Sequence, residues 1–382
     1  MTNESSRVLL TGGAGYIGSH TYVALHEAGL QPVILDNFSN SDPAVLKRLE
    51  RLTGKAVVCE RGDVTDTEFV KHVLRTHHCQ AAVHFAGVKA VGESVAEPLR
   101  YFRTNVGGLI SLLDAMQACA SRAIVFSSSA TVYGEPDEVP IQESSKCAPE
   151  SPYAHTKLMS EQLLSTLRAS DASWRVGVLR YFNPVGAHPS GLIGEDPSGI
   201  PNNLMPYLTQ VAVGKRARLN VFGNDYPTPD GTGVRDYLHV CDLAEGHVAA
   251  VRALLAKPQS FTVNLGTGEG TSVLGVVRAF ERASGRTVPF EFAPRRAGDV
   301  PAYFADVSLA DTVLGWRASR SMDDMCRDAW NWQNSNPNGY RAHDAGSSSA
   351  IDTGGILGRP KGAPLFAPAT PAVRTRAVEA GS

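Results

Sequence analysis

Several features that would place this chain in other protein classes are missing from its sequence. No stretch of about 18 consecutive apolar residues occurs, so we expect no membrane-spanning helix. The polar residues 1–6 lack the basic start and apolar core of a secretory signal, so we expect a cytoplasmic protein. The formal net charge is only −2 in 382 residues, which predicts no general attraction to nucleic acid or to a membrane.

Cysteine is also sparse, with six residues spread over the chain. No two of them form a CxxC pair, which excludes the usual zinc ribbon and dithiol redox motifs. His77, His78 and Cys79 are consecutive, but adjacent side chains rarely converge on one ion. We therefore predict no metal site.

The first half of the chain alternates short apolar runs with helical stretches. We expect a helix at 16–28 that ends at Gly29, and strands at 7–10, 32–35, 56–59, 81–85, 123–127 and 176–179. Strands that are apolar throughout and separated by helices are typical of a parallel sheet covered on both faces. The fold class predicted is therefore α/β, a Rossmann-type doubly wound sheet.

The composition changes along the chain, and the length predicts two domains at roughly 100–200 residues each. We expect a dinucleotide-binding domain at 1–183, to which a strand at 261–265 returns. Loops rich in Pro, Gly and Asn then indicate a smaller, interleaved mixed α/β domain at 184–340 that binds the substrate. Residues 341–382 are rich in small and polar residues, which predicts a disordered tail.

A glycine-rich turn lies between the first strand and the first helix. Gly12 suits a tight turn, Gly15 a close approach to a pyrophosphate, and Gly18 close helix–sheet packing. Glycine spacing alone is a weak signal, but the strand–turn–helix context supports a dinucleotide site. Asp36 ends the next strand, where its carboxylate could accept both adenosine ribose hydroxyls and repel a 2′-phosphate. This favours NAD over NADP, although Asp36 could instead be a simple strand-end cap.

Two later strand ends supply further expected cofactor contacts. Asp63 follows the third strand, where it is placed to meet the adenine. The segment 85–89 follows the fourth, and its small residues would let the main chain run past the cofactor.

A second group of residues indicates acid–base chemistry. Ser151 and Pro152 are typical of a helix start, so Tyr153 and Lys157 would lie on one helical face as an i, i+4 pair. A nearby ammonium would favour the phenolate of a tyrosine, which could then take a proton from a substrate hydroxyl. Ser129 ends a strand, where ligands bind in such folds. A Tyr-x-x-x-Lys pair alone is usually an exposed helix face; the upstream glycine turn and Ser129 favour catalysis here.

At the level of longer motifs, the chain resembles the extended short-chain dehydrogenase/reductase family, and within it the bacterial UDP-glucose 4-epimerases. The resemblance covers about 7–340 and is carried by 84–94 (HFAGVKAVGES), 127–134 (SSSATVYG), 180–191 (RYFNPVGAHPSG), 199–206 (GIPNNLMP) and 230–237 (DGTGVRDY). It implies interconversion of UDP-galactose and UDP-glucose through a 4-keto sugar with tightly bound NAD, in a homodimer.

The resemblance also implies roles for individual residues. Tyr153 would be the base, Lys157 would tune it and hold the nicotinamide ribose, and Ser129 would aid proton transfer. The implied cofactor-binding residues are Gly12, Gly15, Tyr16, Ile17, Gly18, Asp36, Asn37, Phe38, Ser39, Asn40, Ser41, Asp63, Val64, Phe85, Ala86, Gly87, Val88, Lys89, Thr104, Ser129, Tyr153, Lys157 and Phe182. The implied substrate-binding residues are Ser129, Tyr153, Asn183, Asn203, Leu204, Leu219, Asn220, Phe222, Arg235, Tyr237, Val273, Arg296, Asp299 and Tyr303.

For some of these residues, side-chain chemistry independently supports the implied role, and others differ from the residue that relatives have at that position. Arg235 and Arg296 suit a diphosphate on chemical grounds, although either could instead be a surface ion-pair partner. Thr104 stands where relatives often have Asn, and Asn220 where a small apolar residue is common. Tyr303 stands where relatives that accept N-acetylated sugars have a small residue, so we expect poor use of UDP-N-acetylglucosamine.

Two other functions are compatible with the fold. A sugar-nucleotide 4,6-dehydratase would need Asp-Glu just after the catalytic Ser or Thr, whereas this chain has Ala130, Thr131 and Val132. A binding protein that senses NAD without catalysis would have no need of Ser129, Tyr153 and Lys157 together.

Overall fold

The computed structural model describes residues 6–197, 199–296 and 298–342. The predicted tail at 341–382 therefore lies almost wholly outside the described residues. Within the described ranges, no helix is long and apolar enough to cross a membrane.

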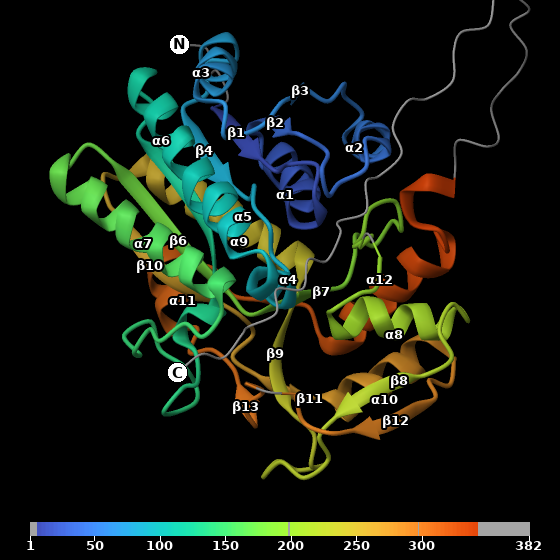
Figure 1. Ribbon diagram of the computed structural model, residues 1–382. Helices are drawn as coiled ribbons and strands as arrows, with labels where there is room; N and C mark the ends of the chain where they lie inside the picture. Colours follow the sequence, from blue (N-terminus) through green and yellow to red (C-terminus); the bar gives the residue numbers. More distant parts are fainter. Residues whose placement is uncertain (1–5, 198, 297, 343–382) are drawn as a thin grey trace, which may run out of the picture. The chain divides into compact units, whose positions relative to one another are not determined.

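A seven-stranded sheet forms the centre of the fold, and all its strand pairs are parallel (Figure 1). In spatial order the strands are β10 (Phe261–Leu265), β6 (Arg175–Tyr181), β5 (Ala123–Ser129), β4 (Ala81–His84), β1 (Arg7–Thr11), β2 (Gln31–Asp36) and β3 (Cys59–Arg61). The strand order reverses between β1 and β4. The carboxyl ends of these two strands are where a parallel sheet of this type binds its ligand.

Helices cover both faces of the sheet, and residues along each strand alternate between them. In β1, Val8 and Leu10 pack into one core with α1 (Tyr16–Glu27), α2 (Ala44–Thr53) and α9 (Val240–Ala256). Leu9 packs into the opposite core with α3 (Thr67–Thr76), α6 (Gly108–Ala118) and α7 (Pro152–Ser170). The predicted doubly wound α/β fold is confirmed.

Each predicted strand is present in the structure, although the ends of the strands differ. The strand expected at 56–59 begins only at Cys59 and is partly exposed rather than buried. The reason is its place at the edge of the sheet, where it has β2 as its one strand neighbour. The first helix ends at Glu27, with Ala28 as its C-cap and Gly29 in a left-handed conformation at φ 81°.

A smaller group of elements lies beyond the carboxyl ends of the large sheet. One small sheet joins β7 (Asn183–Val185), β9 (Val234–His239), β11 (Gly270–Ser272) and β13 (Ala302–Tyr303), and β8 (Leu219–Phe222) pairs with β12 (Phe290–Ala293). The helices α8 (Leu204–Ala212), α10 (Val273–Ser284) and α12 (Met322–Ser335) share one apolar core with β8 and β9. The remaining elements are α4 (Val91–Ala96), α5 (Pro98–Tyr101), the π-helix η1 (Phe102–Gly107), the 3₁₀ helices η2 (Ala130–Tyr133) and η3 (Gly339–Ala342), and α11 (Ser308–Leu314).

Candidate functional site

The glycine turn between β1 and α1 is built so closely that side chains would not fit. Gly12 has φ 69°, and a Cβ there would come within 2.8 Å of the Ala86 main-chain nitrogen after β4. A Cβ on Gly18 would lie 2.5 Å from the Gly12 carbonyl oxygen. The N-cap of α1 is Gly15, which offers no capping side chain, and the first turn has no acidic residue. The first N–H groups of α1 are therefore suited to an anion.

Asp36 lies at the end of β2, directly beside this turn. Its Oδ2 accepts a hydrogen bond from the Ala14 N–H (3.0 Å), and its Oδ1 accepts from the Phe38 N–H and the Ser41 hydroxyl (both 2.9 Å). A carboxylate has about four acceptor positions, and three are used. Contacts to both ribose hydroxyls would therefore require one present donor, most simply Ser41, to turn away. Phe38 has φ 57°, an unfavourable conformation for a bulky residue that this local hydrogen bonding supports.

The other cofactor-side segments lie at the same edge. Asn37 donates to Asp63 across the ends of β2 and β3 (2.8 Å), which joins two of the predicted adenosine segments. The segment after β4 is held by Asn105, whose Oδ1 accepts from the Val88 N–H (2.9 Å) and whose Nδ2 donates to the Val88 carbonyl (3.0 Å).

Asn105 is a residue that the sequence argument missed. Its Nδ2 also donates to the Thr156 hydroxyl (3.0 Å), so it ties the β4 loop to α7 between Tyr153 and Lys157. The wider turn of η1 puts this side chain, rather than that of neighbouring Thr104, on the main chain of Val88. A local departure from α-helical spacing has no clear signature in a single sequence.

The predicted catalytic residues meet where β5 ends against α7. Ser151 caps α7 by accepting a hydrogen bond from the Ala154 N–H (3.2 Å), with Pro152 in the first turn as expected. The Lys157 ammonium donates to the Ser127 carbonyl (2.7 Å) and lies 5.8 Å from the centre of the Tyr153 ring. The Ser129 hydroxyl accepts hydrogen bonds from the Thr131 N–H (3.2 Å) and hydroxyl (3.0 Å).

The acid–base properties of this pair differ from the sequence expectation. Burial raises the pKa of Tyr153 to about 12, because a phenolate is poorly solvated there, and a hydrogen bond with Ser129 opposes this. Burial lowers the pKa of Lys157 to about 8, against the effect of the Glu161 carboxylate. The protein groups alone therefore favour the neutral phenol. The proximity of the ammonium does not overcome the cost of burying the phenolate.

The predicted substrate residues form a second cluster around Asp299. Its carboxylate pairs with Arg235 (3.4 Å) and with Arg296 (2.9 Å). The Arg296 guanidinium also lies 4.7 Å from the centre of the Phe222 ring at the end of β8. Arg235 donates to the Val300 carbonyl (2.9 Å), which fixes its direction. The cluster thus presents two guanidinium groups beside an aromatic face, as a nucleoside diphosphate needs.

The remaining substrate candidates belong to the elements around this cluster. Asn183 begins β7 and donates to the Asp236 carbonyl (2.9 Å), while Asn203 and Leu204 begin α8. Leu219 and Tyr237 are part of the core of this region, and Val273 begins α10. Asn220 faces outward from β8 and is exposed.

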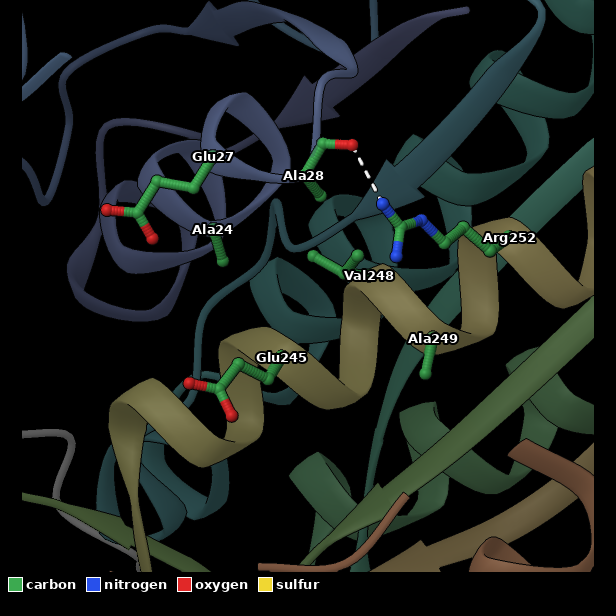
Figure 2. A pocket seen from close by; sticks show the side chains of 7 residues that line it. All are labelled: Ala24, Glu27, Ala28, Glu245, Val248, Ala249 and Arg252. Carbon is green, nitrogen blue, oxygen red and sulfur yellow. Dashed lines mark hydrogen bonds between the residues drawn. The ribbon is translucent and has the colours of Figure 1, made fainter. Parts of the chain in front are cut away.

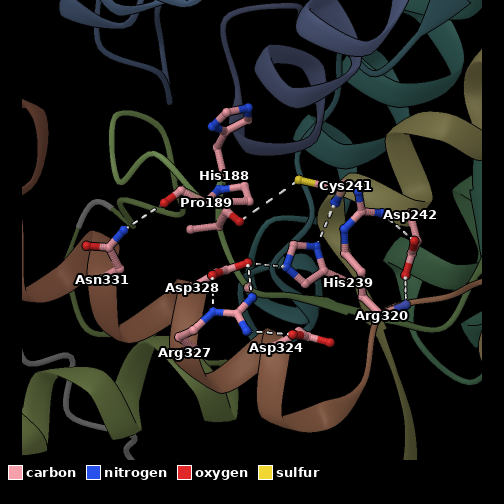
Figure 3. Close-up of polar contacts among 12 residues, drawn as sticks. His188, Pro189, His239, Cys241, Asp242, Arg320, Asp324, Arg327, Asp328 and Asn331 are labelled. Atoms are coloured by element: carbon pink, nitrogen blue, oxygen red, sulfur yellow. Dashed lines mark hydrogen bonds and ion pairs between the residues drawn. The ribbon is translucent and has the colours of Figure 1, made fainter. Parts of the chain in front are cut away.

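The loop after β7 is fastened to both halves of the fold. Tyr16, just after the glycine turn, donates to the Gly186 carbonyl (2.7 Å). Figure 3 shows how α12 holds the same region, with Asn331 donating to the Pro189 carbonyl (2.8 Å). His239 Nδ1 accepts from the Cys241 N–H (3.0 Å), so Nε2 carries the proton and donates to Asp328 (3.2 Å). The Tyr16–Gly186 bond thus holds the loop after β7 to the cofactor side, and the other bonds tie the substrate-side elements to one another.

A cavity of about 280 Å³ lies elsewhere, between α1 and α9 (Figure 2). It is lined by Ala24, Glu27, Ala28, Glu245, Val248, Ala249 and Arg252. None of the predicted site residues lines it. Within the part of the chain that the structure describes, no group of three or more His, Cys, Asp or Glu is arranged to hold a metal ion.

The residues present at the sheet edge fit an NAD molecule. The crowded glycine turn leaves main chain as the wall beside an uncapped helix N-terminus, which suits a pyrophosphate. Asp36 at the end of β2 suits an unphosphorylated ribose. Tyr153 and Lys157 lie on α7, which packs against η1 and β5 at the same edge of the sheet.

Comparison with known proteins agrees with this geometry. A family described as GDP-mannose 4,6 dehydratase matches residues 9–329. The chain is 56% identical to UDP-glucose 4-epimerase of Yersinia pestis over 334 residues, which are 87% of this chain and 99% of that protein. It is 55% identical to the Bacillus subtilis enzyme of the same name over 335 residues, 88% of this chain and 99% of that one.

Solved structures give the same result. UDP-glucose 4-epimerase from Stenotrophomonas maltophila, with bound NAD and formylated UDP-arabinopyranose, superposes with a TM-score of 0.86 at 50% identity, covering 87% of this chain and 99% of that one. The Bifidobacterium longum enzyme, in complex with NAD⁺ and UDP, gives a TM-score of 0.84 at 49% identity, covering 87% of this chain and 100% of that one. Although the matching family is described by a dehydratase, Ala130, Thr131 and Val132 cannot supply the acid and base of dehydration. The chain belongs to the UDP-glucose 4-epimerase family.

Proposed function

We propose that the chain interconverts UDP-galactose and UDP-glucose by inverting C4 through a 4-keto sugar, with NAD held throughout. The observation that carries this proposal is the grouping of Ser129, Tyr153 and Lys157 at the carboxyl edge of the sheet, the edge that also carries the glycine turn. NAD, when bound there, accepts a hydride from C4 and returns it, so the reaction has no net redox change.

Tyr153 acts as the base that removes the proton from the sugar 4-hydroxyl, and Ser129 orients that hydroxyl. Because burial raises the pKa of Tyr153 to about 12, the phenolate needs positive charge close to it. Lys157 supplies one such charge from within its own helix, and the Ser127 carbonyl fixes its direction. Lys157 also holds the nicotinamide ribose.

Arg235 and Arg296 hold the diphosphate, because two guanidinium groups match its charge and geometry. Asp299 keeps both in place by its ion pairs. The Phe222 face lies beside Arg296 for the nucleotide. Strong contacts at the UDP end would leave the hexose free to turn, so that either face of its C4 could meet the cofactor.

The two ligands are assigned to successive parts of the chain. Residues 1–183, with β10, hold the NAD, and residues 184–340 hold the UDP-sugar. The seven-stranded sheet supports this division for the first part, and the ion-pair cluster around Asp299 supports it for the second.

The protein acts as a cytoplasmic homodimer. Support for the dimer comes from large apolar side chains exposed on four neighbouring helices, α4 to α7. They are Val91, Val95, Leu99, Ile110 and Met159, of which Val95 and Leu99 are about two-thirds exposed, at 66% and 67%. Exposed apolar side chains gathered on neighbouring helices are typical of a docking site. Support for the cytoplasm comes from the six cysteines, which are all unpaired.

Proton NMR of the sugar anomeric signals tests the proposal. The purified protein is incubated with UDP-galactose without added NAD. Conversion to a mixture of UDP-galactose and UDP-glucose is expected, since the cofactor stays bound. If no conversion occurs even after NAD is added, the proposed reaction is wrong for this substrate.

A further inference from the structure

Three consecutive serines end β5, and each makes a different contact. The Ser127 carbonyl accepts a hydrogen bond from the Lys157 ammonium, and the Ser129 side chain is hydrogen-bonded with Tyr153. The hydroxyl of Ser128, between them, points to the other side of the strand and donates to the Glu161 carboxylate. Ser128 is 1% exposed, so this contact is made inside the protein.

Glu161 lies one turn after Lys157 on α7 and contacts two strands at once. Besides Ser128 in β5, it pairs with Arg180 in β6, whose Nη2 lies 2.6 Å from Oε2. Ser128 and Arg180 are register partners, side by side across the two strands. Glu161 therefore fastens α7 to both strands at one point, beside the residues of the reaction.

The Glu161–Arg180 ion pair is buried, and Arg180 makes further hydrogen bonds. The side chains of Glu161 and Arg180 are only 9% and 8% exposed. Arg180 also donates to the Tyr133 hydroxyl (3.0 Å) and the Glu143 carbonyl (3.1 Å). A buried ion pair adds little net stability compared with apolar packing, because both charges lose their hydration. Stability alone therefore does not account for charges at this place.

We propose that Glu161 is a positioning residue for the reaction, which holds the Ser127–Ser129 strand end against the face of α7 that carries Tyr153 and Lys157. This inference rests on the proposed function. Without the Ser128–Glu161 contact, the strand end and the helix would keep their fold but lose the fixed spacing between Ser129 and Tyr153.

The charge of Glu161 has a second consequence, for the protonation of Lys157. Glu161 and Tyr153 face Lys157 from its own helix, and the Phe126 ring faces it from β5, with its centre 5.1 Å from the ammonium. From β4 comes His84, which stays neutral because burial, and then the nearby Lys157, lower its pKa to about 3. Glu161 is thus the carboxylate that favours the charged form of Lys157.

Two variants separate the two effects. Ser128→Ala removes one hydrogen bond and leaves the Glu161–Arg180 ion pair in place. It should lower kcat about 10-fold, since small misplacements of reacting groups have large effects on rate. The KM for UDP-galactose should change less than about 2-fold, because the UDP end is held elsewhere. The pH dependence of kcat should keep its shape.

Glu161→Gln removes the charge and keeps the size of the side chain. The basic limb of the kcat–pH profile should move down by about half a pH unit or more, because Lys157 loses the anion that favours its protonation. Ser160→Ala is the matched control. Ser160 lies on the same helix as Glu161 and is buried like Ser128, but its hydroxyl donates to the Thr156 carbonyl and not to the strand. Its kcat and pH profile should match the wild type.

NAD content is measured in every variant after denaturation, so that a loss of cofactor is not mistaken for a loss of positioning. If wild-type protein does not convert UDP-galactose, the proposed function itself fails. If wild-type protein is active but Ser128→Ala has the kcat of Ser160→Ala, the positioning role is overturned. Should Glu161→Gln not fold, because it leaves Arg180 buried without its partner, Ser128→Ala still decides the matter.

Discussion

The Tyr303 hydroxyl donates a hydrogen bond of 2.6 Å to the carbonyl oxygen of Ala130, the residue that follows Ser129. This bond joins β13 to the turn after β5 across the proposed sugar site. The Tyr303 ring lies 5.7 Å from the ring of Phe182, so two aromatic side chains pack together against the turn that follows Ser129.

Replacing Tyr303 by Cys should therefore widen the range of substrates. A phenol ring at this place crowds an acetamido group, whereas a thiol leaves space for it. We expect Tyr303→Cys to gain at least about 10-fold in kcat/KM for UDP-N-acetylglucosamine, measured by proton NMR of both epimers. Tyr303→Phe, which keeps the ring and loses the bond to Ala130, is the control and should show no such gain. An unchanged kcat/KM in Tyr303→Cys would refute the steric argument.

Tyr153→Phe should remove the proposed base while keeping the ring. General base catalysis accelerates a reaction about 10²–10⁴-fold, so kcat should fall by a factor in that range or by more. UDP affinity by calorimetry and NAD content should stay close to wild type, since the ring is kept and other residues hold the UDP and the pyrophosphate. A Tyr153→Phe variant with near-normal turnover would show that another group takes the proton.

Leu99→Glu should weaken the proposed dimer. Leu99 is 67% exposed on the apolar surface of α4 to α7, and a charge there would be buried twice in a symmetric dimer. We expect the dimer Kd to rise about 100-fold or more, measured by analytical ultracentrifugation. Leu309→Glu is the control, because Leu309 is exposed on α11, which packs against α9 and β10 and not against α4 to α7. Equal dissociation of both variants, or a monomeric wild type, would rule out this interface.

Three buried histidines predict that the protein loses stability in mild acid. Burial lowers the pKa of His20 and His84 to about 3 and that of His247 to about 4, from 6.5. Below pH 6.5 the unfolded chain therefore binds protons that the folded protein does not, so the stability present above pH 6.5 decreases as pH falls towards 4. Near pH 5 the free energy of unfolding should change by about 4 kcal/mol per pH unit, because each of the three protons contributes about 1.4 kcal/mol per pH unit.

Urea unfolding between pH 5 and pH 7 measures this slope. The exposed His72 provides the comparison, and His72→Gln should leave the slope as it is in the wild type. A free energy of unfolding that does not change between pH 5 and pH 6.5 would mean that these histidines are protonated in the folded state.

Much of the site could be predicted because it depends on short local patterns. The glycines at 12, 15 and 18 with Asp36 indicate a dinucleotide site, since each requirement is a matter of backbone space or charge next to a strand end. Tyr153 and Lys157 are on one face because helical spacing puts i and i+4 together. The seven-strand sheet follows from apolar runs separated by helices.

The parts that could not be predicted involve contacts between distant segments. Asn105 contacts Val88 from the π-helix η1, 17 residues further along the chain. Glu161, Ser128 and Arg180 meet because α7, β5 and β6 pack together, although nothing in the sequence around them indicates a joint role. The raised pKa of Tyr153 was likewise missed, because burial is a property of the packed structure.

The sequence by itself therefore determined the fold class, and it supplied the prediction of the cofactor edge and of the acid–base pair, since these depend on periodicity and on spacing within one element. Only the tertiary structure decided how that pair is held and how its protonation is biased. Such properties depend on which side chains from separate elements approach within hydrogen-bonding distance, and on how much water they exclude.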